Sequence, residues 1–502
     1  MLAAVVAVLV AVLGIDLHVI VRTADGGTVE GTVSIQTLRI DTAYGHAEVL
    51  AEHLERIECG ETDTVVAAGA TIGGKADLGD LEIRPRDGRE PVTIPKNRIR
   101  SITVIREAAL TPGRITTGVA RNGLTYHLRM PEDAAEGAKV PAILILHGSN
   151  MNSKDYVATI AATWPDLARD FLLIGIDGEQ RSSSSTPQSP RFNYTYVNYV
   201  GRSTYKGYPG TDRESPALVA EALREITARA PVSKVFVGGH SQGGYLTYSL
   251  LMNTPELFAG AFPMSCALII QCEPRAYADE ELKAAQRRLP IAIVHAKDDR
   301  VVGFGEGLYA YEAFEDAGWP GLRMFAPEGP GHRFAHLPLE HAVRWLEAMT
   351  SDDPAALARF AERAAEEGRW RDVCAAAQHA RDLGAAGDVA QRLAAALARA
   401  EEGASAAASD LADAPDAAGQ REWVERYLTF REVFGLTQAA AAPTAIYAAM
   451  RAEQQPRADD LFGRARQAYG RGDHEEGKRL ARLILEECPA SDKFRLVKRW
   501  LE

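Results

Sequence analysis

The sequence lacks the features that would draw a chain to nucleic acid or to a metal ion. It has no run of lysine and arginine, and 68 acidic against 56 basic residues leave a net charge of -12, which gives no reason to expect nucleic acid as a partner. It has only five cysteines, none of them in Cys-x-x-Cys spacing, so a zinc or redox site is not expected. Cys266 and Cys272 are close enough to form a disulfide in an oxidising compartment, but we expect two buried thiols.

Hydrophobic runs are also short. Leu2 to Ile15 form one uncharged stretch of mostly Ala, Val and Leu, which is too short to span a bilayer comfortably. It resembles the apolar core of a secretory signal. Residues 1–15 are therefore interpreted as a signal or anchor segment, and export to the periplasm or the extracellular space is favoured. A plain first strand is the alternative, and a cytoplasmic location is not excluded.

A chain of 502 residues is long enough for several domains. Residues 17–105 show short alternating strands and an internal repeat with a period near 43 residues: Gly27–Gly31 returns as Ala70–Gly74, and Leu38–Ile40 returns as Leu81–Ile83. One unit is too short to bury a core alone, so two units are expected to pack together. This predicts an all-β tandem-repeat domain, with either a binding or a purely structural role.

Residues 114–350 alternate apolar strands with amphipathic helices, which predicts a mostly parallel sheet covered by helices on both faces. The expected strands are Arg114–Gly118, Leu124–Arg129, Ala142–Leu146, Phe171–Ile176, Val235–Gly238, Ala261–Met264, Ile291–His295 and Leu322–Ala326. The expected helices are Lys154–Ala168, Arg213–Ala228, Tyr245–Asn253, Glu306–Ala317 and Glu340–Met349. The carboxyl ends of parallel strands meet at one edge, where we expect the chemistry.

Residues 353–502 are rich in Ala, Glu and Arg with helical spacing. Gly368-Arg369-Trp370 and Gly472-Asp473-His474 each fit the bend of a helix–turn–helix pair. The pattern resembles degenerate tetratricopeptide repeats, which bind protein partners. A plain helical bundle is the alternative.

A serine stands at the turn after one of the expected strands. Val235–Gly238 runs into Gly239-His240-Ser241-Gln242-Gly243, and an expected helix follows at once. A strand, a sharp turn with glycines and a helix expose a serine hydroxyl at the sheet edge, so Ser241 is a candidate nucleophile. Serine needs a histidine base oriented by an acid. Downstream, Asp298 and Asp299 follow one strand, and His332 follows the next.

Residues 114–349 resemble the α/β-hydrolase superfamily, and within it bacterial carboxylesterases of the polyhydroxybutyrate-depolymerase, feruloyl-esterase and phospholipase/carboxylesterase type. The resemblance lies in the elbow Val235–Gly244, in Pro255–Gly260, in His295-Ala296-Lys297-Asp298-Asp299-x-Val301-Val302 and in Pro330-Gly331-His332. It implies a central α/β-hydrolase domain and a Ser-Asp-His triad that cleaves carboxylic esters through an acyl-enzyme.

The resemblance implies that Ser241 is the nucleophile, His332 the base and Asp299 the acid. The competitors are Asp298 for the acid and His336 for the base, whereas His341 is expected at the surface. The oxyanion needs two backbone amides, expected at Gln242 and at either Gly148 or Ser149. His147 and His240 are interpreted as structural residues. No cofactor is needed, and a small-molecule ester is the expected substrate.

The substrate itself is not readable. Residues 178–216 form a long connection of the kind that often acts as a lid, with Phe192, Tyr194, Tyr196, Tyr199, Tyr205 and Tyr208 in quick succession. These rings could line a substrate pocket or cover the sheet edge. A peptidase of prolyl-oligopeptidase type is an alternative function, for which Glu179 is a lone candidate to bind a substrate amine. An inactive hydrolase fold that serves as a scaffold is another.

Overall fold

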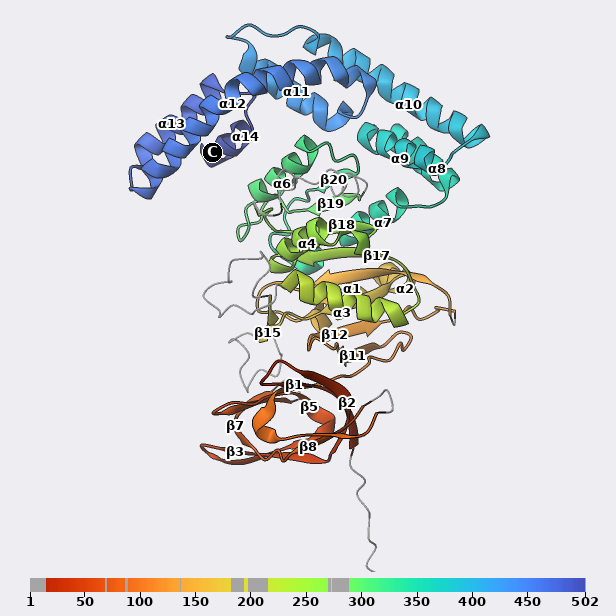
Figure 1. The fold of residues 1–502 in the computed structure, drawn as a ribbon. Helices are drawn as coiled ribbons and strands as arrows, with labels where there is room; N and C mark the ends of the chain where they lie inside the picture. The colour runs from red at the N-terminus through yellow and green to blue at the C-terminus, as the bar shows by residue number, and fades with distance from the viewer. Residues whose placement is uncertain are drawn as a thin grey trace, which may run out of the picture. The chain divides into compact units, whose positions relative to one another are not determined.

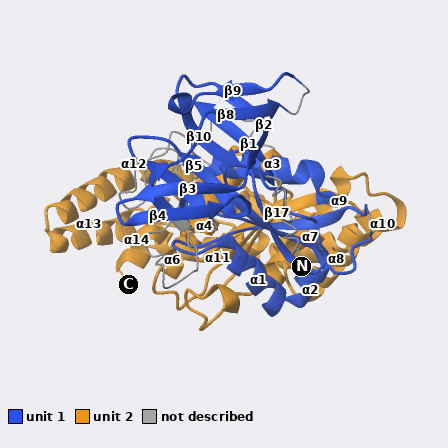
Figure 2. Ribbon diagram, turned by 90° about the horizontal axis from the view of Figure 1, so that it is seen from below, with its two compact units in different colours: residues 1–233 blue, residues 234–502 orange. Residues whose placement is uncertain are grey.

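The structure is a computed structural model that describes residues 15–67, 70–85, 89–135, 137–181, 194–196, 215–269, 272 and 289–501 (Figure 1). The chain divides into two compact units, residues 1–233 and 234–502, which are coloured separately in Figure 2. The interpretation of residues 1–15 as a signal or anchor lies, except for Ile15, outside the described residues. No described helix has the length and the apolar content that crossing a membrane would require.

The first unit begins with a large antiparallel sheet built from two copies of the same element order. Each copy has five strands, with a 3-10 turn between the fourth and the fifth. The first copy contains β1 Ile15–Thr23, β2 Thr28–Ile35, β3 Thr37–Thr42, β4 Gly45–Leu50 and β5 Leu54–Glu58. The second contains β6 Asp63–Ala67, β7 Ala70–Ala76, β8 Leu81–Pro85, β9 Val92–Ile94 and β10 Ile99–Val104. The all-β prediction for this region is confirmed.

The two copies complete each other's sheet. The second strand of each copy pairs with the third strand of the other, as β2 with β8 and β7 with β3. The first strand of each also pairs with the fifth of the other, as β1 with β10 and β6 with β5. A Cβ at Gly31 on β2 would lie 2.4 Å from the Arg84 carbonyl oxygen, and one at the matching Gly74 on β7 would lie 2.4 Å from that of Asp41. Both strand pairings, β2 with β8 and β7 with β3, therefore require glycine at this position.

The first unit continues with strands of a mixed sheet, β11 Ile115–Val119, β12 Thr125–Arg129, β13 Val140–Leu146 and β14 Leu172–Ile176. Their order is β11-β12-β14-β13, and only β13 and β14 pair in parallel. The helices are α1 Ser153–Thr163, α2 Pro165–Asp170 and α3 Ser215–Arg229. The sequence predicts a single helix over Lys154–Ala168, but the structure has two. Pro165 has no backbone N–H with which to continue α1, so α1 ends before it and Pro165 starts α2.

The second unit holds parallel strands in the order β17-β18-β19-β20. Their bounds are β17 Val232–His240 (in this unit from Lys234 on), β18 Gly260–Met264, β19 Ile291–Val294 and β20 Leu322–Phe325. The helices between and after them are α4 Gln242–Asn253, α6 Phe304–Asp316 and α7 Leu339–Met349. Most residues of β17, β18 and β19 are buried, which explains why these strands read as continuous apolar runs.

A helical region follows in the same unit, with α8 Pro354–Glu366, α9 Trp370–Asp382, α10 Gly387–Ala408, α11 Gln420–Phe434, α12 Ala441–Gly470, α13 His474–Glu487 and α14 Phe494–Leu501 (Figure 1). The bend between α8 and α9 uses Gly368 at φ 71°, and the bend between α12 and α13 uses Gly472 at φ 82°. Glycine adopts this left-handed conformation without the strain a Cβ would cause. The helical prediction for this region is confirmed, and its likeness to tetratricopeptide repeats stays a prediction.

Candidate active site

The turn between β17 and α4 holds Ser241 in a strained conformation. Ser241 has φ 53° and ψ -118°, values that a residue with a side chain rarely adopts. A Cβ at Gly239 would lie 2.3 Å from the Gly243 carbonyl group, so the turn can close only with glycine at that position. The Ser241 amide donates to the Met264 carbonyl oxygen at 2.9 Å, which ties the turn to β18. Ser241 is half-buried, whereas His240 and Gln242 on either side of it are buried.

The helix that follows places positive potential beside this serine. Gln242 is the first residue of α4, and no side chain caps this end of the helix. Amides of a first helical turn have no partner within the helix, and the helix dipole adds to their positive potential. An anion that develops next to Ser241 would be stabilised here.

Asp299 and His332 form a hydrogen-bonded pair. His332 Nδ1 lies 2.7 Å from Asp299 Oδ2, and the Asp299 side chain is fully buried. The other carboxylate oxygen accepts from the amides of Val301 at 2.9 Å and Val302 at 3.0 Å. Burial alone would disfavour the charged carboxylate, but the hydrogen bonds from His332 and the two amides outweigh it and hold the pKa of Asp299 below its usual value. With Nδ1 donating to Asp299, Nε2 is the His332 nitrogen that can accept a proton.

The pair lies next to the elbow. The ring centroid of His332 is 4.6 Å from that of His240, the residue directly before Ser241. Burial, together with the charge that His332 can carry, lowers the pKa of His240 to about 3. His240 is therefore neutral at physiological pH. Its ring packs between the end of β17 and the loop that carries His332.

The other candidates for the acid and the base do not take part in the Asp299–His332 pair. Asp298 Oδ1 accepts from the Gly331 amide at 2.8 Å, so it binds the backbone of the loop that carries His332. His336 is exposed in the short 3-10 turn Phe334–His336. His341 is exposed on α7, in agreement with the expectation of a surface residue.

The candidates from the first unit lie after β13. His147 is fully buried, and both of its ring nitrogens meet backbone groups: Nδ1 donates to the Gly148 carbonyl oxygen at 2.7 Å, and Nε2 accepts from the Gly178 amide at 3.0 Å. Burial lowers the pKa of His147. The Gly148 amide donates to the Tyr156 hydroxyl at 3.1 Å. Of the two alternatives for a second oxyanion donor, Gly148 thus already has an acceptor for its N–H.

The first unit also contains a serine, a histidine and an aspartate that sequence reasoning missed. Asp177 Oδ2 lies 3.1 Å from His127 Nε2, and Asp177 Oδ1 accepts from the Ser153 amide at 2.6 Å. The Ser153 hydroxyl is fully buried and donates to the Ile176 carbonyl oxygen at 2.7 Å. A substrate cannot reach that hydroxyl, so this set fixes the start of α1 to the end of β14.

Most of the connection 178–216 lies outside the described residues, among them the side chains of Phe192, Tyr194, Tyr199, Tyr205 and Tyr208. Tyr196 is described and is buried: it stacks on His147 at 4.5 Å, and its hydroxyl donates to the Ile176 carbonyl oxygen at 2.7 Å. For Tyr196 the structure therefore supports the alternative in which the ring covers the sheet edge, here at the end of β14. Cys266 and Cys272 are both buried and free, as expected.

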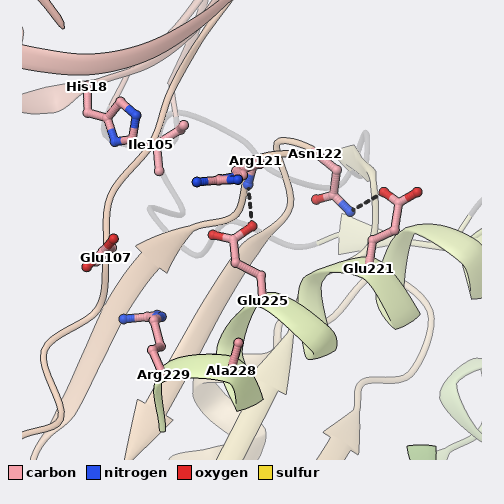
Figure 3. A pocket seen from close by; sticks show the side chains of 9 residues that line it. All are labelled: His18, Ile105, Glu107, Arg121, Asn122, Glu221, Glu225, Ala228 and Arg229. Atoms are coloured by element: carbon pink, nitrogen blue, oxygen red, sulfur yellow. Dashed lines mark hydrogen bonds between the residues drawn. The ribbon is translucent and has the colours of Figure 1, made fainter. Parts of the chain in front are cut away.

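A cavity of about 480 Å³ in the first unit is a second place where a ligand could bind (Figure 3). Arg121 and Asn122 lie on one side of it and α3 on the other; the Arg121 amide donates to Glu225 at 2.9 Å, and the Asn122 side chain donates to the Leu218 carbonyl oxygen at 2.7 Å. None of the described residues that line it is a serine or a cysteine. These lining residues therefore offer no nucleophile comparable to Ser241.

Comparisons with known proteins agree with the resemblance to esterases that the sequence indicated. Residues 201–349 match the sequence model of the family described as phospholipase/carboxylesterase, whereas none of the curated proteins matches the chain. Solved structures that match parts of the chain include a thermostable esterase (16% identity, 66% of this chain and 89% of that chain, TM-score 0.34), an acyl-protein thioesterase 2 from Zea mays (20%, 45% and 99%, 0.34) and a ferulic acid esterase (16%, 46% and 98%, 0.35). At these TM-scores the likeness says nothing about substrate or mechanism.

The family match includes Ser241, Asp299 and His332, and it confirms the resemblance that the elbow and the two later loops indicated. It covers less than half of the chain, so the β repeats and the terminal helices lie outside it. Through residues 201–349 the protein is a hydrolase of the carboxylesterase type.

Proposed function

We propose that the protein hydrolyses carboxylic esters of small molecules through an acyl-enzyme, with Ser241 as nucleophile, His332 as general base and Asp299 as the acid that orients it. The observation that carries this is the Asp299–His332 hydrogen bond of 2.7 Å, beside the ring of the residue that precedes the strained serine. The three residues follow three different strands, β17, β19 and β20, which belong to the parallel part of one sheet.

In the first step His332 Nε2 takes the proton of the Ser241 hydroxyl as its oxygen attacks the ester carbonyl. The buried Asp299 carboxylate stabilises the imidazolium that forms. The Gln242 amide stabilises the oxyanion, and the second donor, from Gly148 or Ser149, stays a prediction. His332 then protonates the leaving alcohol. Water, activated by the same histidine, releases the acid.

The low pKa of Asp299 supports this assignment, because the acid must stay ionised while the histidine gains a proton. Asp298 is the weaker candidate because its carboxylate binds the Gly331 amide. For the peptidase alternative, one oxygen of Glu179, the lone candidate for binding an amine, accepts a hydrogen bond from the Ser215 hydroxyl.

The test combines a fluorophosphonate probe with short-chain p-nitrophenyl esters. Wild-type protein should be labelled and should hydrolyse the esters, and Ser241→Ala should abolish both. His332→Ala should lose roughly 10⁴ or more in kcat, whereas His336→Ala, its matched control on the same loop, should keep wild-type kcat. Persistent labelling of Ser241→Ala, or loss of activity in His336→Ala alone, would overturn the assignment. A parallel panel of peptides distinguishes an esterase from a peptidase.

A further inference from the structure

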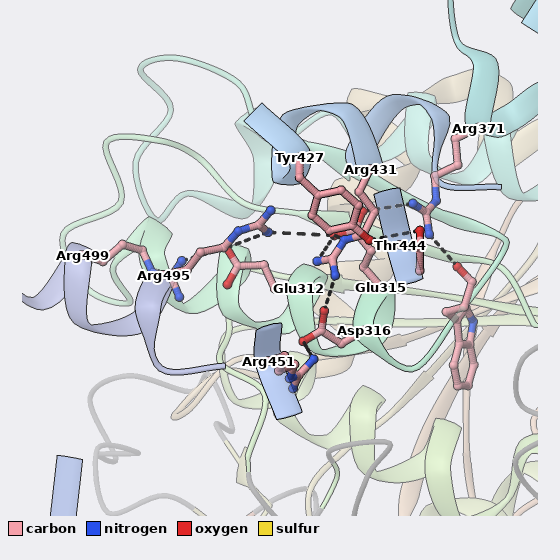
Figure 4. Close-up of polar contacts among 11 residues, drawn as sticks. Glu312, Glu315, Asp316, Arg371, Tyr427, Arg431, Thr444, Arg451, Arg495 and Arg499 are labelled. Carbon is pink, nitrogen blue, oxygen red and sulfur yellow. Dashed lines mark hydrogen bonds and ion pairs between the residues drawn. The ribbon is translucent and has the colours of Figure 1, made fainter. Parts of the chain in front are cut away.

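Helix α6 is held by arginines of the helical region (Figure 4). Glu312, Glu315 and Asp316 are spaced i, i+3 and i+4, so their side chains project from neighbouring positions of one helix face. The arginines that bind them come from α9, α11, α12 and α14, and they are Arg371, Arg431, Arg451, Arg495 and Arg499. This face of α6 is therefore occupied by the chain's own terminal helices.

Glu315 is the most buried of the three acids, with a side chain that is 1% exposed. Arg371 Nη1 lies 3.1 Å from one of its oxygens, and Arg431 Nη2 lies 2.7 Å from the other. Arg371 also donates to the Trp319 carbonyl oxygen at 2.9 Å, just beyond the end of α6. A buried carboxylate is tolerated only with such partners, so the position of α6 depends on them.

The opposite end of α6 supports the loop that holds Asp299. The helix begins at Phe304, directly after that loop. A Cβ at Gly307 would lie 2.6 Å from Nδ1 of His295, so this turn of α6 packs directly on the imidazole. His295 Nε2 donates to the Val302 carbonyl oxygen at 2.8 Å, and the Val302 amide donates to Asp299 at 3.0 Å. The contacts run without a break from the arginines through α6 and His295 to the carboxylate.

We propose that the terminal helices position Asp299 by fixing α6, and that Glu315 and Gly307 are positioning residues for the hydrolysis. The inference rests on the proposed function, because it matters only if Asp299 orients His332. A hydrogen-bonded base must be held within a fraction of an ångström of its productive geometry. A shift of α6 would tilt the loop and lengthen the Asp299–His332 bond, whereas substrate binding would be unchanged.

The experiment compares kcat and KM for p-nitrophenyl butyrate in the full-length chain. Glu315→Gln removes the charge without changing the size of the side chain, and Gly307→Ala disturbs the packing on His295 without touching an ion pair. Both should lower kcat at least about tenfold, since an ångström of misplacement can cost up to about a hundredfold, and both should leave KM within about twofold. Ile57→Ala is the stability control, because Ile57 is fully buried in the core of the β repeats, a cluster that contains no residue of α6 or of the helices that carry the arginines.

The outcomes distinguish a displacement of Asp299 from a general loss of protein stability. If Ile57→Ala has a similar loss of thermal stability and keeps kcat while the two α6 variants lose it, the inference stands. Wild-type kcat in a folded Glu315→Gln, or equal losses of kcat in all three variants, would overturn it. Should Glu315→Gln not fold, Gly307→Ala decides alone, and wild-type kcat in that variant overturns the inference. If the wild-type chain neither hydrolyses esters nor reacts with the fluorophosphonate, it is the proposed function that fails.

Discussion

Replacing His240 by a neutral residue should remove a defined part of the protein's sensitivity to acid. Burial between the β17–α4 turn and the histidine loop lowers the pKa of His240 to about 3, from an ordinary value of about 6.5. The folded protein therefore leaves this ring neutral between these two pH values, whereas the unfolded chain protonates it. Because the unfolded state binds the extra proton, stability is fully present above pH 6.5 and is lost as the pH falls toward 3.

The size of the effect follows from the shift. Each pH unit below 6.5 costs about 1.4 kcal/mol, so at pH 4 the loss through His240 is about 3 kcal/mol. Urea unfolding at pH 7 and pH 4, followed by circular dichroism, measures it as a double difference between wild type and His240→Gln. The variant should be less stable than wild type at pH 7 and should close the gap by about 3 kcal/mol at pH 4.

His240→Asn serves as the control for this experiment. It also lacks a titrating group, so it should show the same pH dependence as His240→Gln even if its stability at pH 7 differs. A free-energy difference between wild type and both variants that stays constant from pH 7 to pH 4 would refute the reasoning, since the ring would then take up its proton equally in both states.

Three further predictions concern substitutions at the proposed acid of the triad and at glycines that have no room for a Cβ. Asp299→Asn should lower kcat by roughly 10⁴, whereas Asp298→Asn, which can still accept from the Gly331 amide, should stay within about tenfold of wild type; equal losses in steady-state assays would contradict the assignment of the acid. Gly239→Ala should cost more than about 4 kcal/mol in urea unfolding, because its Cβ would collide with the first turn of α4, and an unchanged unfolding midpoint would refute that collision. Gly31→Ala and Gly74→Ala should each cost about 1–3 kcal/mol, because each Cβ would meet a carbonyl oxygen of the facing strand at 2.4 Å; full tolerance of either one would show that the two strand pairings are not alike.

The strands of the mixed sheet and the candidate site could be predicted because each depends on residues that are close together in the sequence. Most residues of β17, β18 and β19 are buried on both faces, so apolar runs marked these strands within a few residues. Ser241, Asp299 and His332 are candidates because each follows an expected strand, and the structure brings the last two into a hydrogen bond.

The remaining features depend on partners that are distant in the sequence. Glu315 has the pattern of an ordinary solvated helix position, and its burial depends on Arg371 and Arg431, which come from helices much later in the sequence. His127 and Asp177 are separated by 50 residues, and their pairing gives no local signal. The periodicity of the β repeats likewise predicted two packed copies but could not say which strand of one would pair with which strand of the other.

The two copies of the β repeat pair with each other as two separate subunits could. The first and second strands of each copy each have one neighbour in the other copy, and the same relation holds in both directions. This is the self-complementary arrangement of a two-fold homodimer, here joined into one chain by the short link between β5 and β6. Residues 15–58 expressed alone would therefore be expected to associate as pairs, and the present chain has the geometry of a duplicated and fused subunit.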